Sequence, residues 1–321
     1  MAPVLDAGPV IVRKAPFYES RFLRADAAGG RRALWLRETL LMPTVGESCA
    51  DVWVMVFDPS GHRAIRQSYP IEAADFADEP WTAQLAGTEL DDSHAQGVLP
   101  DGTRWDLSIT PGGQPGVRVL PERSYRARFP TAKTQVRHPL ARFDGRLQLP
   151  DLDIDLDGWI GSVNHNWGSR HTPAYAYGQV CGFDEAPEST LEIVTARAGV
   201  GPVLLPGVTL FVFRHAGLEF AVRSVVGSMQ THGRYRPFSW TFGARVGEQM
   251  IEGEISTVAG DVIGLTYPDT HGGVKYCYNS ALASCRVQVA GKAFQRAELS
   301  SDRAMFEILT DGTVAGVPLL G

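Results

Sequence analysis

Hydrophobic and polar residues alternate along most of the chain in short runs, the pattern of half-buried β-strands. In the run 104–110, Trp105, Leu107 and Ile109 alternate with polar residues. Turn signals separate these runs. The segment Asp58-Pro59-Ser60-Gly61 is one of them, because proline presets φ and glycine accepts a positive φ in a tight reversal.

The same pattern predicts strands over most of the sequence. Helical periodicity of useful length is nearly absent, so the chain is predicted to be all-β. Residues 71–80 are expected to form one short helical or irregular link. The expected strands are 17–25, 33–42, 51–57, 62–69, 82–90, 93–99, 104–110, 190–196, 208–213, 218–224, 237–244, 250–258, 262–267, 273–289, 293–299 and 305–309.

The two halves of the chain contain weakly similar segments. Leu140-Ala141 followed by residues 146–149 resembles Leu282-Ala283 followed by residues 286–289. Many antiparallel strands in each half favour closure into up-and-down barrels, since closure removes exposed strand edges. We therefore predict two tandem antiparallel β-barrels. The predicted domains are 1–157 and 158–321, with the segment 158–183 at their junction.

Aspartates alternate with apolar residues in the run 147–158, just before this segment. Residues 153–158 match the opening of an EF-hand calcium loop. The match then fails, because Asn164 stands where a bidentate glutamate is expected and no flanking helices are visible. The period of two indicates the solvated face of a strand instead, and calcium is not predicted.

Composition sets limits on the class of protein. The 321 residues suggest two domains, and 44% hydrophobic residues allow a sizeable core. The net charge of -6 and the pI near 5.8 come without a basic stripe. They give no sign of nucleic-acid binding or of an anionic membrane surface. No apolar run approaches membrane-spanning length, so no integral membrane segment is expected.

The four cysteines are scattered and form no CxxC pair, which argues against a zinc site and favours a reduced chain. Residues 1–9 lack the basic and apolar regions of a signal peptide. A cytoplasmic location is therefore expected.

Polar and aromatic side chains concentrate in the segment 158–183. Exposed aromatic rings are normally avoided, so these residues indicate a partly buried polar cluster, as in a small-molecule pocket. The alternative is a structural seam in which Trp159 and Trp167 only fill space. The candidate substrate-binding residues are Asn164, Asn166, Arg170, His171, Tyr175, Tyr177 and Gln179.

Trp159, the run His165-Asn166-Trp167-Gly168 and the aromatic strand 175–183 resemble a known group of proteins. This is the carotenoid 1,2-hydratase (hydroxyneurosporene synthase) and AttH-like group of tandem lipocalin-like proteins. Tocopherol cyclase and some pericyclases are similar in fold. The resemblance covers the whole chain as a strand pattern and about 158–183 as a motif. It implies lipocalin-like (calycin) barrels and catalytic roles for His165 and Trp167.

The resemblance also implies a Tyr-x-Asp pair on the next strand, whose aspartate protonates an isolated double bond. The strand 189–197 lacks this pair, and Glu192 is its only carboxylate. Protonating an unactivated alkene requires an acid that burial keeps neutral. Glu192 is therefore the third candidate catalytic residue if it points into the barrel. An outward orientation would argue against carotenoid hydration.

The first hypothesis for function is an enzyme that needs no redox cofactor, either a lyase (hydratase) or an isomerase or cyclase. Its substrate would be hydrophobic, terpenoid- or polyketide-like, and bound in a barrel or where the barrels meet. His165 would be the general acid or base, and Arg170 and Asn166 would hold a developing oxyanion. Trp167, Tyr175 and Tyr177 would shape the cavity and stabilise positive charge.

No cofactor or metal is predicted. The sequence has no glycine-rich phosphate loop between a strand and a helix, no HExxH and no GxSxG motif. His165 and His171 lack a third ligand at a compatible spacing.

The second hypothesis is a non-catalytic carrier of a hydrophobic small molecule. Apolar burial in a barrel would supply roughly 25 cal/mol per Å² of surface removed from water. A ligand recovered unaltered would favour the carrier, and a rearranged or hydrated product would favour the enzyme. The sequence leaves the oligomeric state open. The aromatic residues that could line such a barrel are Trp35, Trp105, Phe211, Trp240 and Phe242.

Overall fold

The computed structural model describes residues 11–29, 31–200, 203–292 and 296–320. The segment 1–9, where no signal peptide is expected, lies outside them, as do residues 293–295 at the start of one expected strand. The chain forms two compact units. Unit 1 comprises residues 1–117, 128–171 and 269–272, and unit 2 comprises residues 118–127, 172–268 and 273–321.

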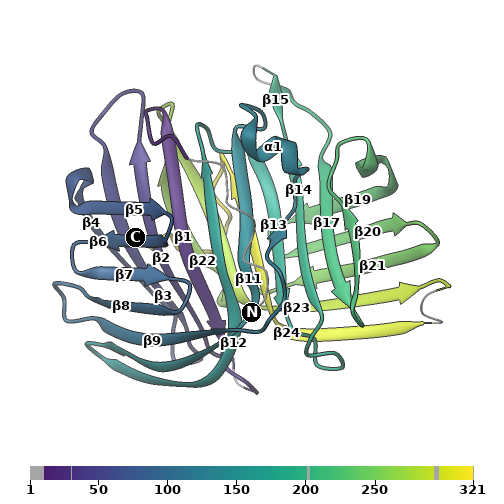
Figure 1. Ribbon diagram of the computed structural model, residues 1–321, viewed down its shortest axis with the longest axis horizontal. Helices are drawn as coiled ribbons and strands as arrows, with labels where there is room; N and C mark the ends of the chain where they lie inside the picture. Colours follow the sequence, from purple (N-terminus) through teal and green to yellow (C-terminus); the bar gives the residue numbers. More distant parts are fainter. Residues whose placement is uncertain (1–10, 30, 201–202, 293–295, 321) are drawn as a thin grey trace. The chain divides into compact units, whose positions relative to one another are not determined.

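Unit 1 is a nearly closed antiparallel barrel, drawn in purple to teal in Figure 1. Its strands follow the order β4-β3-β2-β1-β12-β11-β9-β8-β7-β6-β5, and β10 pairs with β11. A 3₁₀ turn, η1 (Ile71–Ala73), precedes β5. The strands are β1 (Phe17–Asp26), β2 (Ala33–Met42), β3 (Cys49–Phe57), β4 (Arg63–Pro70), β5 (Ala74–Asp78), β6 (Trp81–Leu85), β7 (Thr88–Asp91), β8 (His94–Val98), β9 (Arg104–Pro111), β10 (Val117–Arg118), β11 (Ala132–Leu149) and β12 (Leu152–Gly168).

Unit 2 is a second nearly closed antiparallel barrel, with the order β18-β17-β14-β13-β24-β23-β21-β20-β19 and with β22 paired to β23. It also contains a short helix, α1 (Glu122–Arg126), and the 3₁₀ turns η2 (Gly227–Gln230) and η3 (Ala259–Asp261). The strands are β13 (Ala174–Cys181), β14 (Thr190–Arg197), β15 (Gly199–Val200), β16 (Val203–Leu204), β17 (Val208–His215), β18 (Leu218–Val222), β19 (Thr231–Arg236), β20 (Ser239–Val246), β21 (Gln249–Ser256), β22 (Ile263–Pro268), β23 (Val274–Ala290) and β24 (Ala297–Thr310).

The two units repeat one topology. In unit 1 the first strand, β1, pairs with the last, β12, and in unit 2 β13 pairs with β24. The similar segments of the two halves of the sequence lie on equivalent strands, β11 and β23. Each forms a hairpin with the last strand of its unit, and each hairpin contains register shifts. The sequence similarity therefore marks a real structural repeat.

The expected secondary structure differs from the structure at several places. The link 71–80 begins with the helical turn η1 but continues as the strand β5, and the run 82–90 is divided into β6 and β7. The division occurs at Ala86 and Gly87, which both have positive φ and reverse the chain. The strand β11 was not expected over most of its length. The strand β19 was not expected, because its alternation of half-buried and exposed residues carries little apolar signal.

Two cores fill the barrels. The core of unit 1 includes Leu23, Val54 and Phe143, and that of unit 2 includes Phe211, Trp240 and Phe306.

The alternating aspartates of β12 face solvent as predicted, since the side chains of Asp153 and Asp155 are more than half exposed. Within the described ranges, none of the helices combines the length and hydrophobicity needed to span a bilayer.

Candidate functional site

The central motif forms the second half of β12, and the alternation of this strand sorts its side chains onto two faces. Val163 belongs to the core of unit 1, so His165 and Trp167 also lie on the inner face of this barrel. Their rings are 4.5 Å apart. Asn164 and Asn166 occupy the opposite face, where Asn164 donates to Ser162 at 2.8 Å and Asn166 accepts from Thr134 at 2.6 Å.

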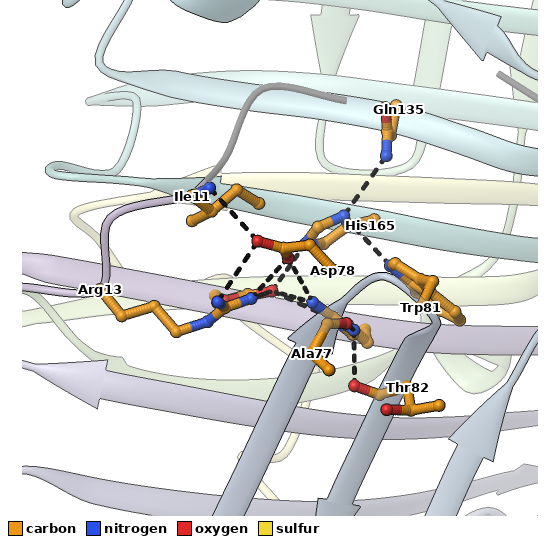
Figure 2. A network of polar contacts seen from close by, with 10 residues as sticks. Ile11, Arg13, Ala77, Asp78, Trp81, Thr82, Gln135 and His165 are labelled. Carbon is orange, nitrogen blue, oxygen red and sulfur yellow. Dashed lines mark hydrogen bonds and ion pairs between the residues drawn. The ribbon is translucent and has the colours of Figure 1, made fainter. Parts of the chain in front are cut away.

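The imidazole of His165 is buried and hydrogen-bonded at both nitrogens, as Figure 2 shows in part. The indole N–H of Trp81 and the side-chain amide of Gln135 both point at Nδ1, each at 3.4 Å. An indole N–H can only donate, so Nδ1 carries no proton. The proton is therefore on Nε2, which donates to Oε1 of Glu19 at 2.8 Å.

Burial lowers the pKa of His165 to about 4, because the nearby carboxylate of Glu19 only partly offsets the loss of solvation. Burial also raises the pKa of Glu19, but the hydrogen bond with His165 and the charge of Arg21 outweigh it and bring this pKa down to about 2. At neutral pH the ring is neutral and Glu19 is a carboxylate. Arg21 supplies its counter-charge at 2.9 Å.

A row of polar side chains crosses the interior of unit 1 at this level. His165, Arg21 and Glu38 are direct cross-strand neighbours on β12, β1 and β2. Arg21 donates to the carbonyl groups of Ala77 and Thr82, at 2.6 Å each, on the far side of the barrel. This guanidinium therefore connects β1 to β5 and β6 across the interior of the barrel.

Glu38 is the protonated member of this row. Burial raises its pKa to about 8, although the hydrogen bond from Thr88 and the charge of Arg21 act in the opposite direction. Thr88 donates to Oε1 at 2.7 Å, while Oε2 has no hydrogen-bond partner among the described residues. A neutral carboxyl group tolerates this site better than a carboxylate would.

The segment before β1 adds further hydrogen bonds to this row of polar side chains. Arg13 donates to Glu19 at 2.7 Å and to Asp78 at 2.8 Å, and the backbone N–H of Ile11 donates to Asp78 at 3.2 Å (Figure 2). We call Arg13, Glu19, Arg21, Trp81, Gln135, His165 and Trp167 the His165 cluster.

A second buried polar group lies in unit 2. Leu191 and Ile193 of β14 belong to the core of this barrel, so Glu192 points away from the core. It is nevertheless fully buried. The hydroxyl of Tyr177 donates to Oε2 of Glu192 at 2.6 Å, and the amide of Gln179 donates to Oε1 at 2.6 Å. This orientation argues against hydration of a carotenoid inside the barrel core.

Tyr175 extends the same face of β13. Its hydroxyl donates to Glu307 of β24, and burial together with the charge of Glu307 raises the pKa of Tyr175 well above 10. Tyr175, Tyr177, Gln179, Glu192 and Glu307 thus form one polar face across three adjacent strands, which we call the Glu192 cluster.

The other predicted site residues lie elsewhere. Arg170 is exposed in the bend after β12. His171 stacks on Tyr18 with ring centroids 3.9 Å apart, and its Nδ1 lies 3.4 Å from Asp269. The predicted set is therefore divided into a group in unit 1 and a group in unit 2, each with its own carboxylates.

Glu19, Arg21 and Glu307 were not among the site residues predicted from the sequence. The sequence of β1 could have indicated the first two, because it twice places opposite charges two residues apart. These pairs are Glu19 with Arg21 and Arg24 with Asp26. In a strand this spacing puts both partners on one face, where they can neutralise each other in a buried site.

A surface concavity of about 410 Å³ lies in unit 1, beside η1 and β5 to β8. Thr88 contributes to its wall, but none of the predicted site residues does. Its outward side chains Asp75, Gln84 and Glu89 are cross-strand neighbours on a solvated sheet face. No group of three potential metal ligands occurs among the described residues.

Comparison with known proteins relates the chain to others mainly through its fold. No protein-family model matches it. The uncharacterised protein Rv0493c of Mycobacterium tuberculosis (strain H37Rv) is 25% identical over 266 residues, which cover 82% of this chain and 78% of that protein. The similarity thus extends through both units.

Three solved structures share the tandem-barrel fold. CghA, determined with Sch210972, has a TM-score of 0.61 at 11% identity and covers 96% of both chains. A candidate AttH protein from Nitrosomonas europaea has a TM-score of 0.57 at 12% identity, covering 94% of this chain and 98% of the other. Kievitone hydratase from Nectria haematococca has a TM-score of 0.53 at 8% identity, covering 97% and 96%.

Proposed function

We propose that the protein is a cofactor-independent enzyme of the hydratase or cyclase type, and that Glu192 exchanges a proton with an unsaturated, largely apolar substrate. The observation that carries this proposal is the fully buried Glu192 carboxyl group held between Tyr177 and Gln179. The shared fold with kievitone hydratase and with CghA supports the class of reaction. The substrate's identity stays open.

The arrangement suits acid–base work at a carbon–carbon double bond. A protonated Glu192 would deliver its proton to one alkene carbon, and water would add to the other carbon and return a proton to the carboxylate. An internal nucleophile in place of water would give cyclisation. Gln179 fixes the carboxyl group, while the hydroxyl of Tyr177 can donate to the carboxylate or accept from the acid. Tyr175 and Glu307 would border the same site.

His165 has a positioning role in this proposal. Its two nitrogens are occupied by Glu19, Trp81 and Gln135 inside unit 1. It would hold β12 and β1 in register, with Trp167 packed against it, rather than touch the substrate. The roles of Asn166 and Arg170 in oxyanion binding stay predictions.

The test uses the full-length protein with kievitone and with linear isoprenoid and polyketide alkenes in D₂O, followed by mass spectrometry. We expect addition of water, or a cyclised isomer carrying deuterium, for at least one compound. Glu192→Gln keeps the shape of the side chain and removes its proton, so we expect turnover to fall about 10²- to 10⁴-fold.

Glu252→Gln, at an exposed position of β21 in the same unit, is the matched control and should keep full turnover. Full turnover in Glu192→Gln would refute the assignment of the acid. Binding of these compounds with recovery of every one unchanged would instead identify a carrier.

A further inference from the structure

The loop between β18 and β19 exposes three large apolar side chains. Val225, Val226 and Met229 have 67%, 73% and 81% of their surface exposed. They lie within five residues of one another, at and beside η2. Scattered apolar residues are common on protein surfaces, but apolar side chains grouped on one loop are typical of surfaces that bind a partner or a membrane.

This loop is well ordered by its own hydrogen bonds. Ser228 donates from its backbone N–H to the carbonyl of Ser224 at 2.9 Å and from its hydroxyl to the carbonyl of Val225 at 2.6 Å. Thr231 fastens the end of η2 to the start of β17 through the carbonyl of Thr209, at 2.9 Å. The fold thus holds the apolar side chains outward instead of letting them collapse onto the barrel.

The surroundings of the loop are basic. Residues 220–247 contain four arginines and no lysine, aspartate or glutamate, and one of the four, Arg223, pairs with Glu219 at 2.7 Å just before this range. Arg223 donates to the carbonyl of Arg118 at 2.7 Å and thereby attaches the segment 118–127 to this part of unit 2.

That segment contains three arginines and one acidic residue, Glu122, which pairs with Arg118. In α1 the ring of Tyr125 is buried under the guanidinium of Arg118, 5.1 Å from its centroid. Arg123 and Arg126 are exposed and have no ion-pair partner among the described residues. Apolar side chains and free arginines therefore occur together on parts of unit 2 that are bonded to each other.

We propose that this part of unit 2 docks on the surface of an anionic lipid membrane. Val225, Val226 and Met229 would enter the boundary between headgroups and acyl chains, and Arg123 and Arg126 would meet lipid phosphates and carboxylates. No anionic membrane surface was expected from the net charge of -6, because the charge of the whole chain does not report on the charge of one loop. Docking would bring the enzyme to the phase in which apolar molecules collect, but the proposal stands without the proposed function.

The test is co-sedimentation of the full-length protein with vesicles of phosphatidylcholine alone and with 30% phosphatidylserine. We expect binding to the anionic vesicles that weakens at high salt. Val226→Asp combined with Met229→Asp should lower the partition coefficient more than tenfold. Arg123→Glu combined with Arg126→Glu should lower it at least fivefold, while circular dichroism stays unchanged.

Two matched substitutions in unit 1 serve as controls. Val45→Asp changes a valine that is 84% exposed, and Arg104→Glu reverses an exposed arginine of β9. Both should bind vesicles like the wild type. Absence of binding, or equal binding by the loop variants, would overturn the proposal. So would a dimer that Val226→Asp dissolves, because the surface would then belong to a protein contact.

Discussion

His165 and Glu19 share one hydrogen bond inside unit 1, and the lowered pKa of His165 contributes to the way the barrel responds to acid. The ring is neutral in the folded protein because burial lowers its pKa to about 4. Protonation would place a second cation beside Arg21 in a site that excludes water. The folded state therefore resists the proton that the unfolded chain accepts readily.

We expect the contribution of His165 to stability to fall in a defined pH window. The folded pKa of about 4 lies below the unfolded value of about 6.5, so this contribution to stability is complete above pH 6.5 and is lost as the pH falls toward 4. At pH 5 the loss is about 2 kcal/mol. Glu38, whose pKa is raised to about 8, stabilises the folded state over the same interval, so the His165 contribution is measured by urea unfolding of both the wild type and His165→Gln at pH 7 and pH 5.

Between pH 7 and pH 5 the change in stability of the wild type should be about 2 kcal/mol less favourable than that of His165→Gln, and the variant should be less stable at pH 7 because its hydrogen bond to Glu19 has a different geometry. An unchanged difference between the two pH values in this variant would show that another group is responsible.

At this scale the sequence could predict His165 and Trp167 as neighbours, because residues two apart on a strand share a face. It could not predict that Glu19 and Trp81 meet the ring, since these partners come from strands far away in the chain. Nor could the sequence show which face of β14 carries Glu192. Thr190 and Val194 share a face with Glu192, and this face is not clearly more polar than the one that enters the core.

The strand β13 is the element that joins the core of unit 2 to the Glu192 cluster. Ala176 and Val180 pack in the core, and Tyr175, Tyr177 and Gln179 face the other side. Gly178 lies between them on the core face. Its missing side chain lets Ile255 and Trp240 press against the backbone of β13.

Gly178→Ala should therefore destabilise unit 2. An added Cβ would lie 2.5 Å from Cδ1 of Ile255 and 3.1 Å from the ring of Trp240, so either the core or β13 must shift. We expect a loss of about 1–3 kcal/mol in the free energy of unfolding. Gly260→Ala is the control, because nothing lies within 4 Å of its Cβ, and it should change stability by less than about 0.5 kcal/mol. Equal stability of the two variants would contradict this account of β13.

Across the whole molecule, alternation and turn signals were enough to predict an all-β chain with a repeated barrel, because both depend on local sequence. They could not reveal that the units exchange segments. Residues 269–272 belong to unit 1, where the carbonyl of Thr270 accepts from Thr44 at 2.8 Å and its hydroxyl donates to Ser169 at 2.9 Å. Residues 118–127 belong to unit 2. The predicted boundary between residues 157 and 158 falls within β12.

A fragment of residues 1–171 should consequently be less stable than unit 1 in the full chain. It lacks the bonds made by Thr270 and the contact between His171 and Asp269, and a typical net loss is about 1 kcal/mol for each bond. Tryptophan fluorescence during urea unfolding reports on unit 1, because six of the seven tryptophans lie there. Thr270→Val in the full chain should reproduce part of the shift. An equal midpoint for the fragment and the full chain would contradict this view.

Because β1 pairs with β12, unit 1 can form only after β12 has left the ribosome. Glu19 lies opposite Trp167, about 150 residues later, so the first strand leaves the exit tunnel without its partner. Residues 269–272 follow about 100 residues after β12, which takes roughly 5 to 20 seconds of translation. The nascent chain must therefore protect β1 from wrong contacts until β12 has emerged, and the hydrogen bonds of Thr270 are added to unit 1 only later.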